Sequence, residues 1–328
     1  MRAFIVSEVD DALSMDVREV EAVASDANDI LVSVDYSGVN FKDAMVAASK
    51  SRVRRVSSLI GGVDAAGTVM HSTDAALPEG TRVAVHGGTL GVARDGGFAQ
   101  SIYSPTNYVT TLADSISTRI AMIIGTAGFT AMESLLALED RGLEAGSEVL
   151  VTGASGGVGS HAVALLAANG YRPVASTGSP TASAWLIERG AVRVIGRDEV
   201  ADNPGRVLAS ETWAGAIDCV GGATLAGILR SLRYGGAVAA SGLVGSAELS
   251  TTVYPFITRS VALLGIDSVE ATRSTRERVW SALGAIATRV DFEALVDREV
   301  QLEELTTALD DIRHGKTRGR ILVNPTPG

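Results

Sequence analysis

The stretch Val149–Gly159 reads Val-Leu-Val-Thr-Gly-Ala-Ser-Gly-Gly-Val-Gly, and it decides the fold class. Its apolar start predicts a buried strand, its glycines at 153, 156, 157 and 159 predict a tight turn, and residues 158–169 follow with a helical pattern. Glycines at these places let the backbone approach a pyrophosphate, whose charge then lies at the positive end of the helix. The stretch therefore predicts a dinucleotide site in an α/β domain.

The sequence around this stretch alternates between strand and helix patterns. After a long apolar helix at 117–138, strands are expected at 148–152, 173–176, 192–195, 215–220 and 237–241, with helices at 158–169, 181–189 and 223–232. This alternation predicts a parallel sheet covered by helices. Residues 1 to about 115 read as short strands with glycine turns, and the chain ends with helices at 272–289 and 302–313 and a strand at 320–323.

Composition limits the function classes. The 328 residues are 46% hydrophobic and carry a formal net charge of −10, which predicts two globular domains and argues against a nucleic-acid binder. The single cysteine, Cys219, excludes a disulfide framework and a cysteine-rich zinc site. No run of 18 apolar residues is uninterrupted, so no membrane span is expected, and the cytoplasm is the expected compartment.

Three other interpretations of the glycine stretch are possible. Short-chain dehydrogenases share its spacing but need a Tyr-xxx-Lys pair, and no tyrosine of this chain has lysine four residues later. Gly153–Gly157 also fits the Gly-x-Ser-x-Gly elbow of α/β-hydrolases, with Ser155 as nucleophile and His314 as an available base. A structural turn without a ligand is the third possibility.

The residues after the glycine stretch indicate which dinucleotide is bound. An NAD site usually has a carboxylate about 20 residues further on, to hold the ribose 2′-hydroxyl. No Asp or Glu lies between Gly159 and Glu188, and the second strand ends in Ser176-Thr177-Gly178-Ser179. Arg197 follows the next strand and would supply a cation for a 2′-phosphate. NADPH is therefore expected in preference to NADH.

Six segments in order along the chain resemble one known family. They are Asn40–Asp43, Gly62–Gly67, Ile124–Ala131, Val151–Gly159, Trp213–Asp218 and Gly265–Ser268. Together they resemble the zinc-free, quinone oxidoreductase-like branch of the medium-chain dehydrogenase/reductases, and within it the NADPH-dependent acryloyl-CoA reductases. The resemblance implies a GroES-like β-barrel catalytic domain (1–120 and 292–328) and an inserted Rossmann domain with a doubly wound parallel sheet (121–291).

The resemblance also implies the chemistry. Gly62-Val63-Asp64 stands where zinc-dependent members carry Gly-His-Glu, and one cysteine with four scattered histidines cannot build a zinc site. Without metal, the expected reaction is NADPH-dependent reduction of an activated C=C bond, in acryloyl-CoA or another short enoyl-CoA. The resemblance implies Asn40 as a donor near the substrate, Arg320 as the cation that orients or stabilises charge, and Asp43 and Asp64 as carboxylates that hold Arg320 or Lys42.

Cofactor contacts implied by position involve both domains. They are Phe41, Ser155, Gly156, Gly157, Val158, Thr177, Gly178, Ser179, Arg197, Leu243, Ile257 and Ser268. Two residues depart from the subgroup: Phe41 stands where tyrosine is frequent, which removes a hydroxyl near the nicotinamide. Ser179 stands where a phosphate-binding arginine is common, which weakens the expected preference for NADPH.

One basic cluster, Lys50-Ser-Arg52-Val-Arg54-Arg55, stands out in this acidic chain. Arginines suit phosphate recognition, so the cluster would bind the tail of a CoA substrate, whereas a small quinone would not need it. A quinone or enone reductase of the same fold is the main alternative, and a cofactor-binding regulator without turnover is a third class. The resemblance further implies a homodimer.

Overall fold

The computed structural model describes residues 1–201 and 207–326, and these form two compact units. The first unit comprises Met1–Thr126 and Val269–Gly328, and the second comprises Ala127–Ser268. Each is described by itself below. An inserted domain was expected, and the second unit is shorter than the predicted range of 121–291.

The second unit is built on a six-stranded parallel sheet. Its strands are β9 (Glu148–Thr152), β10 (Arg172–Thr177), β11 (Arg193–Gly196), β12 (Trp213–Asp218), β13 (Leu232–Ala240) and β14 (Ala262–Gly265). They lie in the order β11-β10-β9-β12-β13-β14, and every pair is parallel. The order reverses direction between β9 and β12, and ligands of open α/β sheets bind at such a point, beyond the carboxyl ends of the strands.

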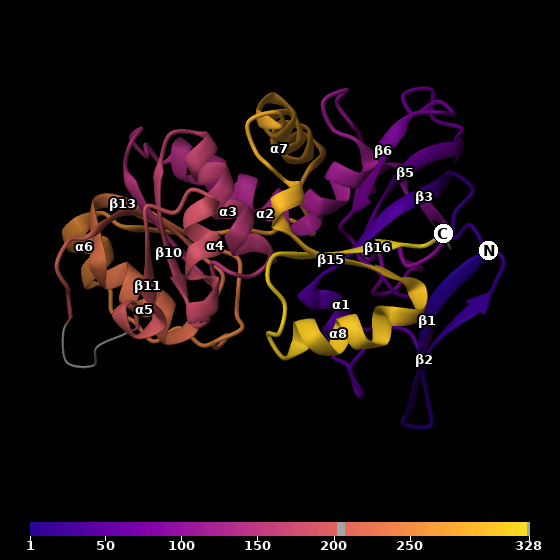
Figure 1. Cartoon of the computed structure of the whole chain (residues 1–328), viewed down its shortest axis with the longest axis horizontal. Coiled ribbons are helices and arrows are strands. Elements are labelled where there is room, and N and C mark those ends of the chain that lie inside the picture. The colour runs from indigo at the N-terminus through magenta and orange to yellow at the C-terminus, as the bar shows by residue number, and fades with distance from the viewer. Residues whose placement is uncertain (202–206, 327–328) are drawn as a thin grey trace. The chain divides into compact units, whose positions relative to one another are not determined.

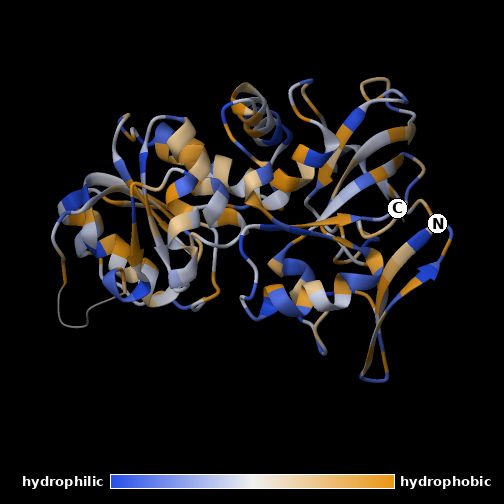
Figure 2. Cartoon of the chain, in the orientation of Figure 1, coloured by the Kyte–Doolittle hydropathy of each residue, from blue (hydrophilic) through white to orange (hydrophobic). Residues whose placement is uncertain are grey.

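Apolar strands and helices form the core of the second unit. The helices are α3 (Gly157–Ala168), α4 (Ser183–Glu188), α5 (Gly222–Ser231) and α6 (Tyr254–Arg259), with short 3-10 turns at Pro180–Ala182 and Arg197–Glu199. Leu150, Val174 and Val238 are fully buried between them, and each such side chain stabilises the fold by about 1.5–3 kcal/mol relative to exposure. Figure 2 shows hydrophobic segments, in orange, on the strands and on the helices that pack against them.

Helix α2 (Thr118–Asp140) is interrupted by a kink. Gly125 has φ 48° and ψ −158°, a conformation outside the helical region that L-residues with side chains rarely adopt. The helix is long and apolar enough to cross a membrane by length and composition, but 72% of its most apolar window is buried inside the protein. We therefore interpret it as a buried helix of the core.

The first unit contains two sheets. The smaller has the order β2-β1-β4, and the larger has the order β15-β16-β3-β5-β6-β8, with β7 paired to β3. The bounds are β1 Arg2–Val9, β2 Ala12–Glu19, β3 Ile30–Val39, β4 Ser58–Ile60, β5 Asp64–His71, β6 Arg82–His86, β7 Ser101–Ser104, β8 Val109–Thr111, β15 Val296–Gln301 and β16 Arg320–Asn324. The last strand, β16, pairs antiparallel with β3, so the end of the chain completes the sheet begun near its start.

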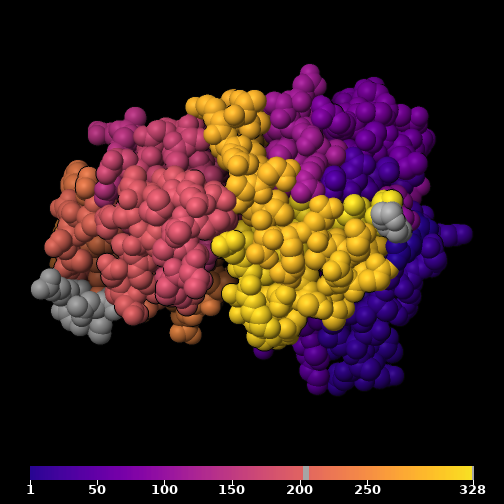
Figure 3. All heavy atoms as spheres, in the orientation of Figure 1, coloured from indigo at the N-terminus to yellow at the C-terminus, as the bar shows by residue number. Residues whose placement is uncertain are grey.

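Three helices accompany these sheets. They are α1 (Phe41–Val46), α7 (Arg273–Ile286) and α8 (Leu305–Arg313), with 3-10 turns at Thr106–Tyr108, Glu293–Leu295 and Leu302–Glu304. Leu305, Ala308 and Leu309 of α8 pack in one buried cluster with Phe4 of β1 and Ala44 of α1. Figures 1 and 3 show these segments from opposite ends of the chain side by side.

Helix α7 explains why the second unit ends earlier than expected. The side chain of Arg276, 3% exposed, donates to the carbonyl oxygen of His86 at the end of β6 (2.9 Å), and Trp280 Nε1 donates to His86 Nε2 (3.1 Å). Burial and the nearby Arg276 lower the pKa of His86 to about 3, so the ring stays neutral and can accept this bond. These buried contacts fasten α7 to the first unit, although its sequence pattern continues the series of helices before it.

Candidate active site

The glycine-rich turn follows the central strand of the second unit. Thr152 ends β9, Gly153 takes φ +60°, and α3 begins at Gly157. A Cβ at Gly159 would lie 2.3 Å from the carbonyl oxygen of Gly153, so this crossing of backbone tolerates no side chain. The N-cap, Gly156, provides no side-chain acceptor for the first N–H groups of α3. These N–H groups and the helix dipole therefore suit an anion such as a pyrophosphate.

The end of β10 lies next to this turn and carries hydroxyl groups. Ser155 Oγ and Thr177 Oγ1 are 3.0 Å apart, which joins the turn to the neighbouring strand. Ser179 N donates to Thr177 Oγ1 (3.1 Å), and Gly178 between them is exposed. The turn and this strand end thus form one continuous surface of backbone N–H and hydroxyl donors.

Arg197 lies against that surface. A Cβ at Gly178 would be 2.3 Å from Arg197 Nε, so the guanidinium is folded directly over the glycine. The side chain is exposed, and among the described residues it forms no ion pair with a carboxylate. A guanidinium beside two hydroxyls is a donor set suited to a phosphate, and the residues present therefore fit a phosphorylated dinucleotide.

The remaining predicted cofactor residues differ in accessibility. Leu243 and Ile257 expose 58% and 72% of their surface in the second unit, and Phe41 exposes 38% at the start of α1 in the first. Ser268 is buried, and its hydroxyl pairs with Thr130 Oγ1 at 2.9 Å. Direct cofactor contacts of these four residues stay predictions.

Ser241 follows β13 at the same edge of the sheet, and its hydroxyl oxygen is buried. This hydroxyl bonds to the thiol of Cys219, where it opposes the rise that burial causes in the pKa of the thiol. The hydroxyl therefore has a sulfur partner within the protein and is no independent sign of a ligand.

In the first unit, the predicted catalytic residues form a buried network around Arg320. This side chain is 2% exposed at the start of β16. Its Nε donates to Ile123 O (3.1 Å), one terminal nitrogen donates to Val39 O and Asn40 Oδ1 (both 3.0 Å), and the other donates to Met122 O (3.4 Å). That last nitrogen also lies 3.5 Å from Asp64 Oδ2.

Asp64 receives three hydrogen bonds from two segments of the chain. Asn40 Nδ2 donates to it at 2.8 Å, Thr126 N at 2.9 Å and Thr126 Oγ1 at 2.5 Å. A Cβ at Gly125 would lie 2.5 Å from the same carboxylate, so the kink of α2 is built around Asp64. Thr126 belongs to this site, and sequence reasoning missed its role although it lies within the quoted Ile124–Ala131 segment.

The polar side chains of this network bond to one another and to backbone carbonyl oxygens of the protein. Asn40 Nδ2 donates to Gly38 O (3.2 Å) as well as to Asp64, and Arg320 is surrounded by carbonyl oxygens. The geometry thus identifies a scaffold that holds 38–40 and 122–126 in place. The expected contacts of Asn40 and Arg320 with a substrate stay predictions.

Asp43 has a separate place in the same network. It lies in the first turn of α1, and its carboxylate accepts from Asn40 N (2.7 Å) and Val63 N (2.9 Å). Asp43 therefore fixes the backbone at Asn40 and at Val63, the residue before β5, rather than the side chain of Arg320. Burial, and secondarily the charge of Asp64, raise the pKa of Asp43 to about 7, while the two backbone bonds oppose the shift.

The basic cluster at 50–55 divides into buried and exposed side chains. Arg54 forms an ion pair with Glu8 and donates to Val46 O (2.7 Å), and its side chain is only 4% exposed. The expectation that Arg54 binds CoA phosphate is therefore corrected, because its guanidinium holds the loop to β1. Arg52 and Arg55 are exposed and form no ion pair among the described residues.

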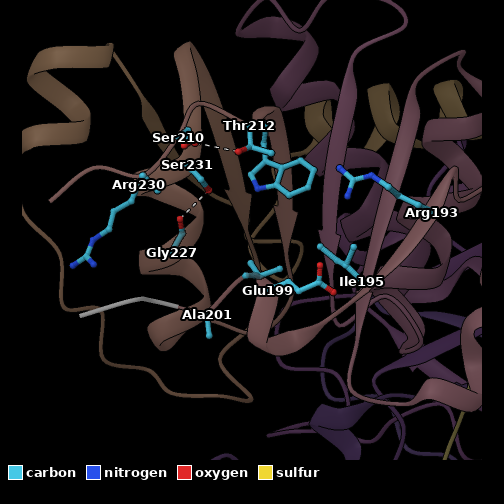
Figure 4. Close-up of a pocket in the computed structure, with 12 residues that line it drawn as sticks. Arg193, Ile195, Glu199, Ala201, Ser210, Thr212, Gly227, Arg230 and Ser231 are labelled. Atoms are coloured by element: carbon cyan, nitrogen blue, oxygen red, sulfur yellow. Dashed lines mark hydrogen bonds between the residues drawn. The ribbon is translucent and has the colours of Figure 1, made fainter. Parts of the chain in front are cut away.

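A cavity of about 410 Å³ lies at the other edge of the second unit's sheet. Arg193 and Trp213, the first residues of β11 and β12, contribute to its lining, and the Arg193 guanidinium lies 5.2 Å from the centre of the Trp213 ring. Figure 4 shows Arg193 in this lining, with Thr212 Oγ1 donating to Ser210 O. Because it opens mainly at the amino ends of strands, this cavity is distinct from the glycine turn.

Two further expectations concern alternative chemistry. Ser155 has Thr177 as its hydroxyl partner rather than a histidine, and His314 Nδ1 bonds to Asp310 O of its own helix at 2.9 Å. The structure thus gives no support to Ser155 as a hydrolase nucleophile. Across residues 1–201 and 207–326, no group of three or more His, Cys, Asp or Glu side chains is placed to hold a metal ion.

Two family models match the chain. Residues 26–114 match the alcohol dehydrogenase GroES-like domain, and residues 157–284 match the zinc-binding dehydrogenase domain. Their positions agree with a GroES-like first unit and a Rossmann-like second unit.

Individual relatives match over nearly the whole chain. The putative quinone oxidoreductase YhfP of Bacillus subtilis is 43% identical over 95% of each chain, and its crystal structure with NAD bound has a TM-score of 0.95, covering 98% of each chain at 42% identity. The acrylyl-CoA reductase AcuI of Ruegeria pomeroyi is 40% identical over 94% of this chain and 93% of its own. The yhdH oxidoreductase of Salmonella enterica in complex with NADP has a TM-score of 0.94, with 39% identity over 99% of this chain and 100% of its own.

Fold, glycine turn and relatives agree on one family. The chain belongs to the medium-chain dehydrogenase/reductases, in the zinc-free, quinone oxidoreductase-like branch that includes the acryloyl-CoA reductases.

Proposed function

We propose that this oxidoreductase uses NADPH to reduce the activated C=C bond of a short enoyl-CoA, with acryloyl-CoA as the best candidate. The observation that supports NADPH as the cofactor is the position of Arg197. Its guanidinium is folded over Gly178, beside Thr177 and Ser179, where an NAD-specific site would have a carboxylate. Relatives named for acryloyl-CoA reduction, from Ruegeria pomeroyi and Escherichia coli at 40% and 39% identity, support the substrate.

The residues assigned to the cofactor fall into two groups. The N–H groups of Ser155–Val158 would hold the pyrophosphate, and Thr177, Gly178, Ser179 and Arg197 would hold the phosphorylated ribose. NADPH, when bound, supplies a hydride for the β-carbon of the enoyl group, and a proton from solvent or a side chain completes the saturated product. The exposed surfaces of Leu243 and Ile257 are accessible for apolar contacts with this ligand, and Phe41 is exposed in the first unit.

The Arg320 network would act by positioning. Arg320, Asp64 and Asn40 hold the backbone of 38–40 and 122–126 through bonds between buried atoms. Rigid backbone at a reduction site allows N–H and hydroxyl groups to meet the negative charge that develops on the thioester oxygen. We therefore assign Asn40, Asp43, Asp64 and Arg320 as positioning residues, with Thr126 as an added member.

A quinone or enone reductase is the second candidate, because the 43% identical relative bears the name putative quinone oxidoreductase. The two candidates share the cofactor site and differ in the substrate tail. The exposed Arg52 and Arg55 favour the CoA ester, since guanidinium groups suit its phosphates. We also propose that the protein is located in the cytoplasm and forms a homodimer.

The experiment that tests this function compares substrates. NADPH oxidation is followed with acryloyl-CoA, crotonyl-CoA, a small quinone and a simple enone, and kcat/KM is determined for each. The proposal predicts the highest kcat/KM for acryloyl-CoA. A quinone that exceeds every enoyl-CoA would favour the second candidate, and NADPH binding without turnover of any acceptor would favour a regulator.

A further inference from the structure

The strand β12 ends in a buried carboxylate that the proposed reaction does not use. Asp218 is 0% exposed and accepts from Thr152 Oγ1 (2.5 Å), Gly221 N (2.8 Å) and Val220 N (3.3 Å). Its partners are thus one hydroxyl and two backbone N–H groups, with α5 beginning at Gly222. Burial raises the pKa of Asp218, while these three bonds oppose the shift.

The hydroxyl partner is the residue that precedes the glycine turn. β9 and β12 are neighbours in register, with Val151 opposite Ile217, so Thr152 and Asp218 end adjacent strands at the same level. Thr152 is 1% exposed, and its Oγ1 also accepts from Cys219 N at 3.1 Å. One hydroxyl therefore joins the start of the glycine turn to the side chain of Asp218 and to the backbone after it.

The backbone at Cys219, directly after Asp218, is packed closely between Gly153 and Gly242. A Cβ at Gly153 would lie 3.3 Å from Cys219 Cβ, and one at Gly242 would lie 2.0 Å from Cys219 O. Gly159 in turn crosses Gly153 so closely that a Cβ there would be 2.3 Å from Gly153 O. Cys219 is therefore packed closely against Gly153, and Gly153 against Gly159 in the first turn of α3.

Burial of a carboxylate without a cationic partner costs desolvation free energy. Apolar residues of similar size would stabilise the sheet without this cost. A fully satisfied polar network in a core does, however, specify one arrangement of the groups around it. We propose that Thr152 and Asp218 are positioning residues of the cofactor site, which set the glycine turn for the pyrophosphate by bonding β9 to the start of α5. This inference rests on the proposed use of a dinucleotide.

The test removes the hydroxyl with little change of shape. Thr152→Val lacks the bonds to Asp218 and Cys219, whereas Thr152→Ser keeps them. Ser231→Ala is the matched control, since its hydroxyl bonds to Gly227 O at the other end of α5. For each full-length variant, the Kd for NADPH is measured by titration of nicotinamide fluorescence, and the melting temperature is measured without cofactor.

We expect Thr152→Val to raise the Kd for NADPH about tenfold or more, as loss of a hydrogen bond to a charged group implies. Thr152→Ser should stay within about threefold of the unchanged protein, and Ser231→Ala should leave the Kd the same. A Thr152→Val protein that binds NADPH normally but melts at a lower temperature would overturn the inference and leave the pair a purely structural role.

A second variant keeps the test decisive if Thr152→Val does not fold. Asp218→Asn preserves the shape but places an NH₂ group against the N–H of Gly221, and it should raise the Kd to a similar extent. Normal binding by a folded Asp218→Asn would likewise overturn the inference. Failure of the unchanged protein to bind NADPH or NADH is a distinct result, which would contradict the proposed function itself.

Discussion

At the scale of single residues, burial decides which of the chemically plausible side chains can meet a ligand. Arg54 and Arg320 are buried among backbone carbonyls and carboxylates, whereas Arg52 and Arg197 are exposed. Breaking a buried pair by removing one partner costs about 3–5 kcal/mol, whereas an exposed pair contributes about 0–1 kcal/mol. The sequence alone could not separate these arginines, because Arg320 bonds Asn40 across 280 residues and Arg54 bonds Glu8 across 46.

The exposed Arg197 should carry the preference for NADPH. Arg197→Ala removes a charge-assisted contact with the 2′-phosphate, so the Kd for NADPH should rise about tenfold while the Kd for NADH changes little. Arg193→Ala, which removes an exposed arginine at the opposite end of β11, is the control. Fluorescence titration with both cofactors checks this, and an equal effect of Arg197→Ala on NADPH and NADH would contradict a phosphate contact.

The raised pKa of Asp43 predicts a pH dependence of stability. The pKa of Asp43 is about 7 in the folded protein, against an ordinary value of 3.8, so between these pH values the folded state holds a proton that the unfolded chain has released. The free energy of unfolding should therefore fall as pH rises through this window, by at most about 1.4 kcal/mol per pH unit, and level off above it. Below about pH 4 both states are protonated and the stabilisation is complete.

Urea unfolding of the unchanged protein and Asp43→Asn between pH 4 and 9 measures this effect. The difference in unfolding free energy between the two should decline toward neutral pH. Asp16→Asn, a change of an exposed carboxylate, should give a nearly constant difference. Parallel curves for the unchanged protein and Asp43→Asn would show that Asp43 titrates normally in the folded state.

At the scale of elements, the second unit could be predicted more fully than the first. The range of β9 was predicted to the residue, and the bounds of α3 to within one, because a glycine turn between an apolar strand and a helix is a strong local pattern. Strands β2, β4, β8 and β15 of the first unit lie outside the ranges expected to be strands, and so does β14 of the second unit. The exposed, charged sequence of β2 acquires its structure from pairing with β1, which no local pattern shows.

Helix α2 shows the same limit within one element. The range 117–138 was expected to be continuous, because isolated glycines are tolerated in helices. The break at Gly125 arises from Asp64, which lies 62 residues from Thr126 in the sequence. Both the N–H and the hydroxyl of Thr126 donate to the Asp64 carboxylate, so this N–H does not form the bond of a regular helix. The quoted family segment contained these residues, but their role depended on a contact between distant parts of the chain.

The turn before α3 should be intolerant of any side chain at its crossing point. Gly159→Ala places a methyl group 2.3 Å from a carbonyl oxygen, so the free energy of unfolding should fall by about 1–3 kcal/mol and NADPH binding should weaken. Gly265→Ala, where a Cβ would have no heavy atom within 4 Å, should change stability by less than about 0.5 kcal/mol. Urea unfolding and NADPH titration measure both, and equal behaviour of the two variants would contradict the observed crossing.

At the scale of the whole molecule, the order of elements along the chain explains which elements form each of the two units. The N-terminal strands and the last strand form one sheet, and the α/β unit is inserted between them. The sequence predicted its carboxyl-terminal limit at residue 291, after α7, whereas Arg276 and Trp280 of α7 are bonded to His86 of β6. Sequence patterns describe each helix well, but not the sheet on which it packs.

The whole-molecule account also predicts which substrates depend on the exposed arginines. The double variant Arg52→Ala with Arg55→Ala should raise KM for acryloyl-CoA about tenfold and leave KM for a small quinone unchanged, since only the CoA ester carries phosphates. Arg18→Ala is an exposed control on β2. Steady-state kinetics decide the matter, and an equal rise for both substrates would exclude a role in binding the CoA tail.

The central claim is hydride transfer from NADPH to an enoyl thioester, and isotope labelling tests it directly. The unchanged protein is supplied with acryloyl-CoA and with NADPH deuterated at C4 of the nicotinamide, in each of the two configurations separately. Mass spectrometry of the product should show propionyl-CoA with one deuterium at the β-carbon from one configuration only. No labelled propionyl-CoA from either configuration, with NADPH consumed by a quinone instead, would contradict the account.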